Sequence, residues 1–353
     1  MTSEIAKPLP QADLAHVMQF ARQDLEKLRG ARIFVTGGTG FFGKWLVGSF
    51  LHANRELQLA ASLTELTRDP ERFRAENPAF AADPSLLLHA GDVRTFAFPP
   101  GKFSHAILGA SSAGSGPLDL FSTIVDGTRH TLDFAARCGV QRVLFLSSGA
   151  VYGAQPSVIR HVPETYHGAL DQLQPGSTYG VAKRAAEHLC RIFSATHVLE
   201  SVVARCFAFS GPYLPLNANF AIGNFMGDVI AGRPISIQGD GTPYRSYLHA
   251  ADLAVWLWAL LIRGRSGSAY NVGSDEDVSI AELARAVAEE SGTRTEVRIA
   301  RTPVPGAPPS RYVPSIDRAR FELGLEPRIR LRDGIRRTFE WLRQSSPAAK
   351  SAP

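Results

Sequence analysis

The chain has 353 residues, 44% of them apolar, and its 38 lysine and arginine residues against 33 aspartate and glutamate residues give a formal net charge of +5. This length and apolar content allow a large buried core and two lobes. The small basic excess is dispersed, whereas a surface that tracks nucleic-acid phosphates concentrates its charge in a stripe. We therefore expect no nucleic-acid partner.

The three cysteines, Cys138, Cys190 and Cys206, lie far apart and lack the spacing of a metal or redox motif. This is typical of free thiols in a reducing compartment. The first twenty residues lack the basic and apolar regions of a signal peptide, and the longest apolar run, 254–262, is too short to span a membrane. We expect a cytoplasmic protein with no membrane partner.

Helical spacing of apolar residues from 11 to 29 predicts a helix before the first strand. We assign residues 1–30 to an N-terminal helical extension that packs on the outside of the following domain. From 31 to 210, strand and helix patterns alternate, which predicts right-handed crossovers and a parallel, doubly wound α/β sheet. The expected strands are 31–36, 62–67, 86–89, 104–108, 142–146 and 199–205, and the expected helices are 40–53, 117–138 and 178–195.

After Gly211 and Pro212 the pattern changes to short strands near 235–238 and 245–248, with helices near 220–231, 250–262 and 279–291. It predicts a smaller C-terminal substrate-binding lobe over 211–344, crossed by a proline-rich strap at 302–314. The last residues, 345–353, have the small and polar composition of a disordered tail.

The segment 36–43 reads Thr-Gly-Gly-Thr-Gly-Phe-Phe-Gly, directly after an apolar strand pattern and directly before a helical one. A dinucleotide pyrophosphate needs this order, because glycines let the backbone approach the phosphates while the helix directs its free N–H groups at them. The candidate cofactor-binding residues in this segment are Gly37, Gly40, Phe41, Phe42 and Gly43.

A second motif, Tyr179-Gly-Val-Ala-Lys183, falls within an expected helix. Its spacing places a phenol and an ammonium on one helix face, one turn apart. The cation can then lower the pKa of the phenol, which would exchange a proton with a carbinol. Each motif is weak alone, but together they indicate hydride chemistry.

With these motifs in this order, the chain resembles the extended short-chain dehydrogenase/reductase family, specifically its nucleotide-sugar epimerases, dehydratases and reductases, from about Ala31 to Trp341. The resemblance implies a Rossmann-type dinucleotide-binding domain over 31–210, a nucleotide-sugar substrate and a homodimer formed by helices 117–138 and 178–195. It also implies that Ser148, which precedes Val151-Tyr152-Gly153 by three residues, hydrogen-bonds the substrate oxygen. The candidate catalytic residues are Ser148, Tyr179 and Lys183.

The two positions after Ser148 are Gly149 and Ala150, where related 4,6-dehydratases have an acidic pair. Elimination of water needs an acid and a base, which these two residues cannot supply. The sequence therefore favours a 4-epimerase or a keto-sugar reductase and does not decide between them. A dehydratase with non-standard acid and base residues, or a catalytically silent cofactor-binding protein, remains as an alternative.

Cofactor choice depends on the end of the second strand, where an acid would accept from a ribose hydroxyl and an arginine would pair with a 2′-phosphate. Arg68 at this place favours NADP(H) over NAD, although an arginine can equally stack on adenine. By resemblance, Asp92 and Val93 form the turn that contacts adenine, and Ala110 and Ser111 lie beside the nicotinamide ribose.

Four residues of the second lobe are candidate substrate-binding residues by resemblance: Asn219, Asn224, Arg245 and Arg311. The two arginines would clamp the nucleotide diphosphate by bidentate contacts. Each of them could instead be a surface ion-pair residue.

Two further departures concern positions where the family commonly has asparagine, and this chain has Asp126 and Ala208. The first asparagine supports the catalytic hydrogen-bond network, and the second contacts the substrate. In the long loop 154–176, His161, Glu164 and His167 match no metal-ligand motif. We expect no metal, and we interpret this loop as a solvated lid over the sugar.

Overall fold

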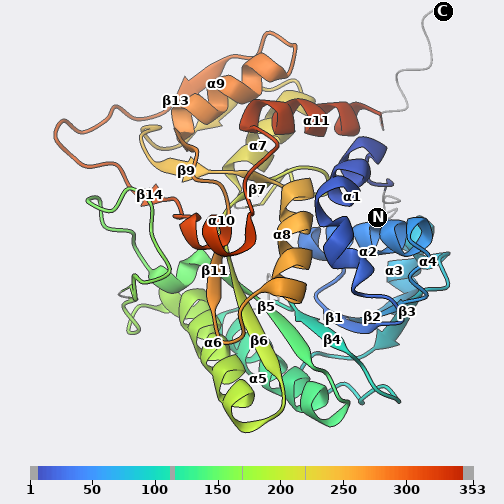
Figure 1. Cartoon of the computed structure of the whole chain (residues 1–353). Helices are drawn as coiled ribbons and strands as arrows, with labels where there is room; N and C mark the ends of the chain where they lie inside the picture. The colour runs from blue at the N-terminus through green and yellow to red at the C-terminus, as the bar shows by residue number, and fades with distance from the viewer. Residues whose placement is uncertain (1–6, 112–115, 169, 219, 345–353) are drawn as a thin grey trace, which may run out of the picture.

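The computed structural model describes residues 7–111, 116–168, 170–218 and 220–344 (Figure 1). Its centre is a seven-stranded sheet in the order β3-β2-β1-β4-β5-β6-β11, in which every neighbouring pair is parallel. The predicted doubly wound parallel sheet is therefore confirmed. The strands are β1 (Arg32–Thr36), β2 (Ser62–Thr67), β3 (Leu86–Ala90), β4 (His105–Leu108), β5 (Arg142–Ser148), β6 (Glu200–Cys206) and β11 (Ala269–Val272).

Alternation along β1 shows how the two faces of the sheet are covered. Ile33 and Val35 belong to the core cluster that contains side chains of α2 (Phe41–Glu56) and α8 (Ala250–Arg263). Phe34 points the other way and joins a cluster with α5 (Pro117–Arg137) and α6 (Thr178–Thr196). Successive residues of a strand point to opposite faces of the sheet. A strand that is apolar at every position is therefore buried only when helices cover both faces of the sheet.

The N-terminal extension forms α1 (Gln11–Glu26), whose apolar face packs on α8 and α2 (Figure 1). Two polar contacts fasten it to α8. Asp24 accepts a hydrogen bond from Arg263 at 2.7 Å, and the His16 ring lies 2.7 Å from Asp252. The extension is therefore anchored to a helix from the distant C-terminal half of the chain.

The rest of the C-terminal half builds a smaller unit around its own core cluster. Its short sheets are β12-β9-β14, β13-β8 and β10-β7. Although β11 and α8 fall within 211–344, β11 is the last strand of the large sheet and α8 packs against one face of that sheet. The other elements are α7 (Ala221–Ile230), β8 (Ile235–Ile237), β9 (Tyr244–Ser246), β10 (Leu248–His249), β12 (Asp277–Ser279), α9 (Ile280–Glu290), β13 (Val297–Ile299), β14 (Arg311–Tyr312), α10 (Asp317–Leu323) and α11 (Leu331–Arg343), with α3 (Pro70–Glu76), α4 (Pro78–Ala81) and β7 (Phe209–Ser210) earlier in the chain.

The proline-rich strap that carries β14 pairs with the loop that follows β5. Bridges join Gln155 to Arg311 and Val162 to Pro314. The N–H of Val162 donates to the carbonyl oxygen of Val313 at 2.9 Å. These backbone contacts hold the strap against the segment that leaves the end of β5. Among the described helices, none has the length and apolar character needed to cross a membrane.

Candidate active site

The glycine turn between β1 and α2 is packed too closely to hold side chains. Gly37 has a φ of +79°, and a Cβ atom built on it would lie 2.5 Å from the backbone of Gly109. A Cβ on Gly43 would lie 2.1 Å from Gly38. Gly40 is the N-cap of α2, so the free N–H groups of this helix face the turn. The turn therefore has the compact form that admits a phosphate group.

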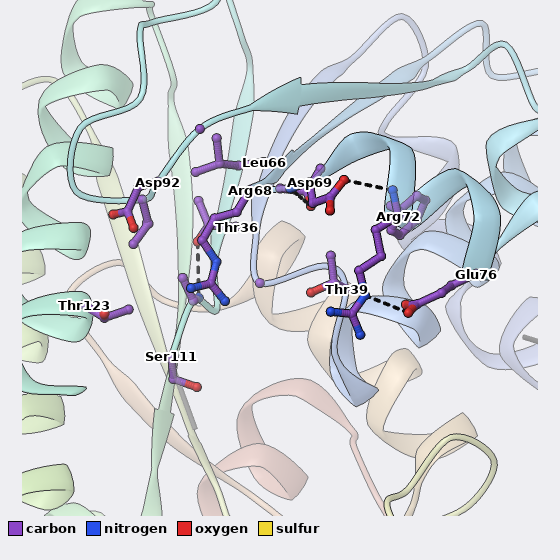
Figure 2. Close-up of a pocket in the computed structure, with 16 residues that line it drawn as sticks. Thr36, Thr39, Leu66, Arg68, Asp69, Arg72, Glu76, Asp92, Ser111 and Thr123 are labelled. Atoms are coloured by element: carbon purple, nitrogen blue, oxygen red, sulfur yellow. Dashed lines mark hydrogen bonds and ion pairs between the residues drawn. The ribbon is translucent and has the colours of Figure 1, made fainter. Parts of the chain in front are cut away.

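A cavity of about 380 Å³ opens beside this turn, at the carboxyl ends of the central strands (Figure 2). Six of the predicted cofactor-binding residues line it, namely Gly37, Arg68, Asp92, Val93, Ala110 and Ser111. The predicted Gly40, Phe41, Phe42 and Gly43 do not line it; the two phenylalanines pack in the core, and the Phe42 ring lies 5.1 Å from that of Phe209. Residues that sequence reasoning missed complete the lining: Thr36, Thr39, Leu66, Thr67, Asp69, Arg72, Phe73, Glu76, Gly91 and Thr123.

Two arginines, Arg68 and Arg72, line the end of the cavity near β2 (Figure 2). Asp69 caps α3 by accepting from the Arg72 N–H at 2.9 Å. The Arg72 side chain donates to Glu76 at 2.7 Å. The last residue of β2 is Thr67, which has no carboxylate to accept from a ribose hydroxyl. Because Arg72 is already paired with Glu76, Arg68 is the group at this end that is better suited to pair with an anionic group.

Asp92 holds a tighter position than the sequence indicated. Its two carboxylate oxygens accept from the Arg94 guanidinium at 2.7 and 2.8 Å, and Arg94 also donates to Asp119 at 2.7 Å. Hydrogen bonding from Arg94 lowers the pKa of Asp92. The carboxylate is therefore ionised and fixed, and its remaining lone pairs can accept from a further donor.

A buried carboxyl group, Glu65 on β2, lies under the glycine turn. A Cβ atom on Gly38 would be only 2.3 Å from the Glu65 Cδ atom. Neither oxygen of Glu65 has a hydrogen-bond partner within the described residues. Burial raises the pKa of Glu65 to about 8, against the opposing charge of Lys44. Sequence reasoning missed this group, because a glutamate inside a strand pattern suggests a solvated position.

The predicted catalytic residues come together at the end of β5. Ser148 is the last residue of that strand, and its hydroxyl accepts from the Ala150 N–H at 3.1 Å. Burial raises the pKa of Tyr179, while a hydrogen bond with Ser148 lowers it. In the chain alone, burial therefore outweighs the lowering that the Tyr-x-x-x-Lys spacing predicts.

Lys183 is buried beside Tyr179 on the same helix. Its ammonium lies 5.8 Å from the centre of the Tyr179 ring and donates to the carbonyl oxygen of Leu146 at 2.7 Å. Burial lowers the pKa of Lys183 to about 8. With this pKa, Lys183 is still protonated at neutral pH, and a charged group that enters the site would shift its pKa.

A network of buried polar side chains joins α6 to the strands and to the strap. Glu187 accepts from Ser147 at 2.6 Å and from Arg205 at 2.7 Å. Arg205 donates to the Tyr152 hydroxyl at 2.9 Å, and this hydroxyl donates to Asn271 at 2.8 Å. The Asn271 amide donates in turn to backbone carbonyls of the loop and the strap. The network fixes the catalytic helix relative to the residues that cover it.

The predicted substrate-binding residues do not all share one setting. Arg311 forms an ion pair with Asp277 at 2.7 Å, and both side chains are largely shielded from solvent. Arg245 has no ion pair among the residues that the structure describes, and its guanidinium lies 5.9 Å from the Tyr312 ring. Asn224 is exposed on α7, and Asn219 lies outside the described residues.

The positions that depart from the family pattern have simple surroundings. Asp126 is exposed on α5 and accepts from Ser122 at 2.6 Å, so it does not take part in a network at Ser148. Thr123, one turn earlier, lines the cavity instead. Ala208 packs against the core of the smaller unit.

The loop 154–176, which we expected to be a solvated lid, is held to β11 and to the strap by hydrogen bonds. Glu164 accepts from the Asn271 backbone N–H at 2.9 Å, and burial raises its pKa. The His161 Nε2 atom is buried without a hydrogen-bond partner in the described part of the chain. No group of three or more potential metal ligands occurs within the described ranges.

Comparison with known proteins adds a family, two relatives and a solved structure. The model of the NAD dependent epimerase/dehydratase family matches residues 33–273. UDP-glucuronic acid decarboxylase 5 of Arabidopsis thaliana is 27% identical over 336 residues, 93% of this chain and 92% of that protein. The dTDP-glucose 4,6-dehydratase of Streptomyces niveus is 27% identical over 341 residues, 89% of this chain and 93% of that protein. The crystal structure of DesIV, a dTDP-glucose 4,6-dehydratase from Streptomyces venezuelae with NAD and TYD bound, gives a TM-score of 0.74 at 26% identity and covers 89% of this chain and 97% of that one.

Proposed function

Because the chain belongs to the NAD-dependent epimerase/dehydratase family, we propose that it transfers a hydride between a nicotinamide cofactor and ring carbon C4 of a nucleotide-linked hexose. Members of this family are NAD-dependent enzymes that act on nucleotide sugars. The product is either the C4 epimer or a reduced keto-sugar.

One observation carries this proposal. Ser148, Tyr179 and Lys183 come together at the end of β5, whereas the two residues that follow Ser148, Gly149 and Ala150, have no carboxyl group. Hydride transfer at a carbinol needs one proton carrier and one oxygen-stabilising donor, and both are present. Elimination needs an additional acid and base, which these positions do not supply.

In this mechanism each residue has one task. The Tyr179 phenolate accepts the proton of the C4 hydroxyl, and Ser148 hydrogen-bonds the same oxygen. Lys183, fastened to the Leu146 carbonyl oxygen, keeps a positive charge near the phenol. The cofactor supplies the hydride acceptor or donor. Return of the hydride to the opposite face yields the epimer, and net addition yields the reduced sugar.

The cofactor that we propose is NADP(H), with NAD as the alternative. Thr67 ends β2 where an acid would select NAD, and Arg68 and Arg72 line the same end of the cavity. A 2′-phosphate would pair with the Arg68 guanidinium, while Arg72 is held by Glu76. NADPH would favour net reduction over epimerisation, because an epimerase regenerates its cofactor within each cycle.

We also propose a homodimer that forms through α5 and α6, which lie side by side on one face of the sheet (Figure 1). Leu118 and Phe121 on α5 are 87% and 38% exposed, and Ile192 on α6 is 42% exposed. A second copy would cover these apolar side chains in a four-helix bundle.

The test combines two measurements on the purified protein. Mass spectrometry identifies the nucleotide released on denaturation, and chromatography follows UDP- and dTDP-linked hexoses, UDP-glucuronic acid and 4-keto sugars after incubation. Retained NAD with interconversion of C4 epimers supports an epimerase. Uptake of NADPH with its oxidation by a 4-keto sugar supports a reductase.

Three outcomes would contradict the proposal. Release of carbon dioxide from UDP-glucuronic acid would indicate a decarboxylase, and formation of a 4-keto-6-deoxy sugar from dTDP-glucose would indicate a dehydratase. Cofactor binding without turnover of any substrate in the panel would indicate a silent cofactor-binding protein.

A further inference from the structure

A second phenol, that of Tyr312, reaches the catalytic serine from the strap. Hydrogen bonding by Ser148 acts to lower the pKa of the Tyr312 phenol, as it does that of Tyr179. A Cβ atom on Gly149 would lie 2.7 Å from the Tyr312 Oη atom. The hydroxyl therefore occupies the space that a side chain directly after Ser148 would need.

Tyr312 is held in this place by the backbone on both sides. The Tyr244 N–H on β9 donates to the Ser310 carbonyl oxygen at 2.8 Å, and the Val313 N–H donates to the Gln155 side chain at 2.9 Å. Its ring lies 4.7 Å from that of Phe207. These contacts hold the backbone on both sides of Tyr312 and pack its ring, with the hydroxyl against Gly149, the residue after Ser148.

Proton counting at Ser148 gives this contact a function. A serine hydroxyl has two acceptor lone pairs and one proton. One lone pair accepts from the Ala150 N–H at 3.1 Å. If the other lone pair accepts from Tyr312, the single Ser148 proton remains for Tyr179 or for the substrate oxygen.

We propose that Tyr312 is a positioning residue of this site, whose hydroxyl donates to Ser148 Oγ and thereby directs the Ser148 proton toward Tyr179 and the reacting oxygen. This inference rests on the hydride-transfer function proposed above. A side chain at position 149 would displace the Tyr312 phenol. The lack of an acid directly after Ser148 is therefore what leaves room for Tyr312.

The charged and titratable groups around Tyr312 fit a donor. Tyr179 of α6, Cys206 of β6 and Arg245 of β9 face it, and burial raises the pKa of Tyr312 above its ordinary value despite the Ser148 hydrogen bond. The Tyr312 phenol therefore keeps its proton across the neutral range and can donate. Tyr179 is the phenol that gives up its proton in the reaction.

The test is Tyr312→Phe, which removes one oxygen and keeps the ring. The ionisation of Tyr179 is followed by the ultraviolet absorbance of tyrosinate, as the difference between each protein and the same protein with Tyr179→Phe. We expect the midpoint of this titration to move to higher pH, because the Ser148 proton is no longer directed to the phenolate. We expect kcat to fall roughly ten- to hundredfold, with KM little changed.

Two further variants complete the experiment. Tyr244→Phe removes a neighbouring phenol whose ring packs under Arg311, and it should leave both the midpoint and kcat unchanged. Gly149→Ala displaces the Tyr312 hydroxyl without deleting it and should shift the midpoint in the same direction as Tyr312→Phe. This second variant keeps the inference testable if Tyr312→Phe fails to fold.

The outcomes separate this inference from the proposed function. An unchanged midpoint and unchanged kcat in folded Tyr312→Phe would overturn the positioning role, even in an active enzyme. A shifted midpoint in a protein that turns over no nucleotide sugar would support the contact between Tyr312 and Ser148 and would overturn the proposed function instead.

Discussion

The Lys183 ammonium donates a hydrogen bond of 2.7 Å to the carbonyl oxygen of Leu146, two residues before Ser148 on β5. This contact joins the helix that carries Tyr179 to the strand that carries Ser148. It also holds the ammonium 5.0 Å from the centre of the Phe145 ring, in a buried place. The site therefore depends on a cation that burial destabilises.

Lys183→Met should make the protein more stable at pH 7 and inactive. The ordinary pKa of Lys183 is 10.5, and burial lowers it to about 8 in the folded state. Between these values the unfolded state binds more protons, so stability rises with pH across this window and the charged form costs stability below it. Removing the charge should raise the free energy of unfolding at pH 7 by an amount of order 2 kcal/mol, after the loss of the hydrogen bond.

Urea denaturation of both proteins from pH 7 to pH 10.5 measures this difference. The difference in free energy of unfolding between Lys183→Met and wild type should shrink as pH rises from about 8 to 10.5. An advantage that stays constant over the whole range would show that Lys183 does not titrate as the structure indicates.

Glu65→Gln should remove a pH-dependent loss of stability and of cofactor affinity. Burial raises the pKa of Glu65 from 4.5 to about 8, so the folded state binds more protons than the unfolded state between these values. Wild-type stability should therefore fall as pH rises from about 4.5 to 8, by an amount of order 3 to 4 kcal/mol, and the variant should lack this slope. Above pH 8 the wild-type carboxylate would also repel phosphates at the Gly38 turn.

Thermal denaturation and cofactor titration at pH 6 and pH 9 check both effects. Glu71→Gln, on the exposed surface of α3, is the matched control and should keep the wild-type pH dependence. Parallel pH profiles for wild type and Glu65→Gln would refute the prediction.

Tyr179→Phe should lower turnover by roughly two to four orders of magnitude, the usual contribution of general acid–base catalysis. Cofactor affinity should stay near that of wild type, since the ring packing is kept. Ser148→Ala should lower turnover less, because it removes an oxygen-stabilising hydrogen bond but leaves the proton carrier. Steady-state kinetics with a substrate from the panel measures both, and near-normal activity in Tyr179→Phe would remove the basis of the mechanism.

Arg68→Ala should weaken NADPH binding by roughly ten- to a hundredfold and leave NADH binding nearly unchanged. The reason is that a charge-assisted hydrogen bond contributes about 1.5–3 kcal/mol, and only NADPH offers the 2′-phosphate. Fluorescence titration of both cofactors gives the ratio. Arg74→Ala is the control, because Arg74 pairs with Glu71 on α3 and does not line the cavity. An equal loss for both cofactors would assign Arg68 to adenine stacking.

Phe121→Asp should weaken the proposed homodimer, because it places a charge in the apolar patch on α5. Sedimentation velocity should show a dimer for wild type at micromolar concentration and monomers for the variant. The control is Phe321→Asp, at a residue 82% exposed on α10, away from this patch. A wild-type protein that sediments only as a monomer would exclude the dimer.

Short-range patterns in the sequence predicted the sheet and much of the site. Strand and helix periods depend on residues within one or two turns, and glycine turns and helix spacing are equally local. For this reason the parallel sheet, the turn at Gly37 and the meeting of Tyr179 with Lys183 could be derived without coordinates. Ser148 followed only from the resemblance of the segment around Val151-Tyr152-Gly153 to the family pattern.

Contacts between distant segments were decided only by the tertiary structure. Arg311 forms an ion pair with Asp277, Glu65 lies buried under the glycine turn, and Tyr312 reaches Ser148, although no local pattern distinguishes these residues from solvated ones. Their surroundings are set by which strands become neighbours and how the strap crosses the loop after β5. A sequence states which residue types are present, but burial and charge depend on partners brought together by the whole fold, and these interactions set how each side chain behaves.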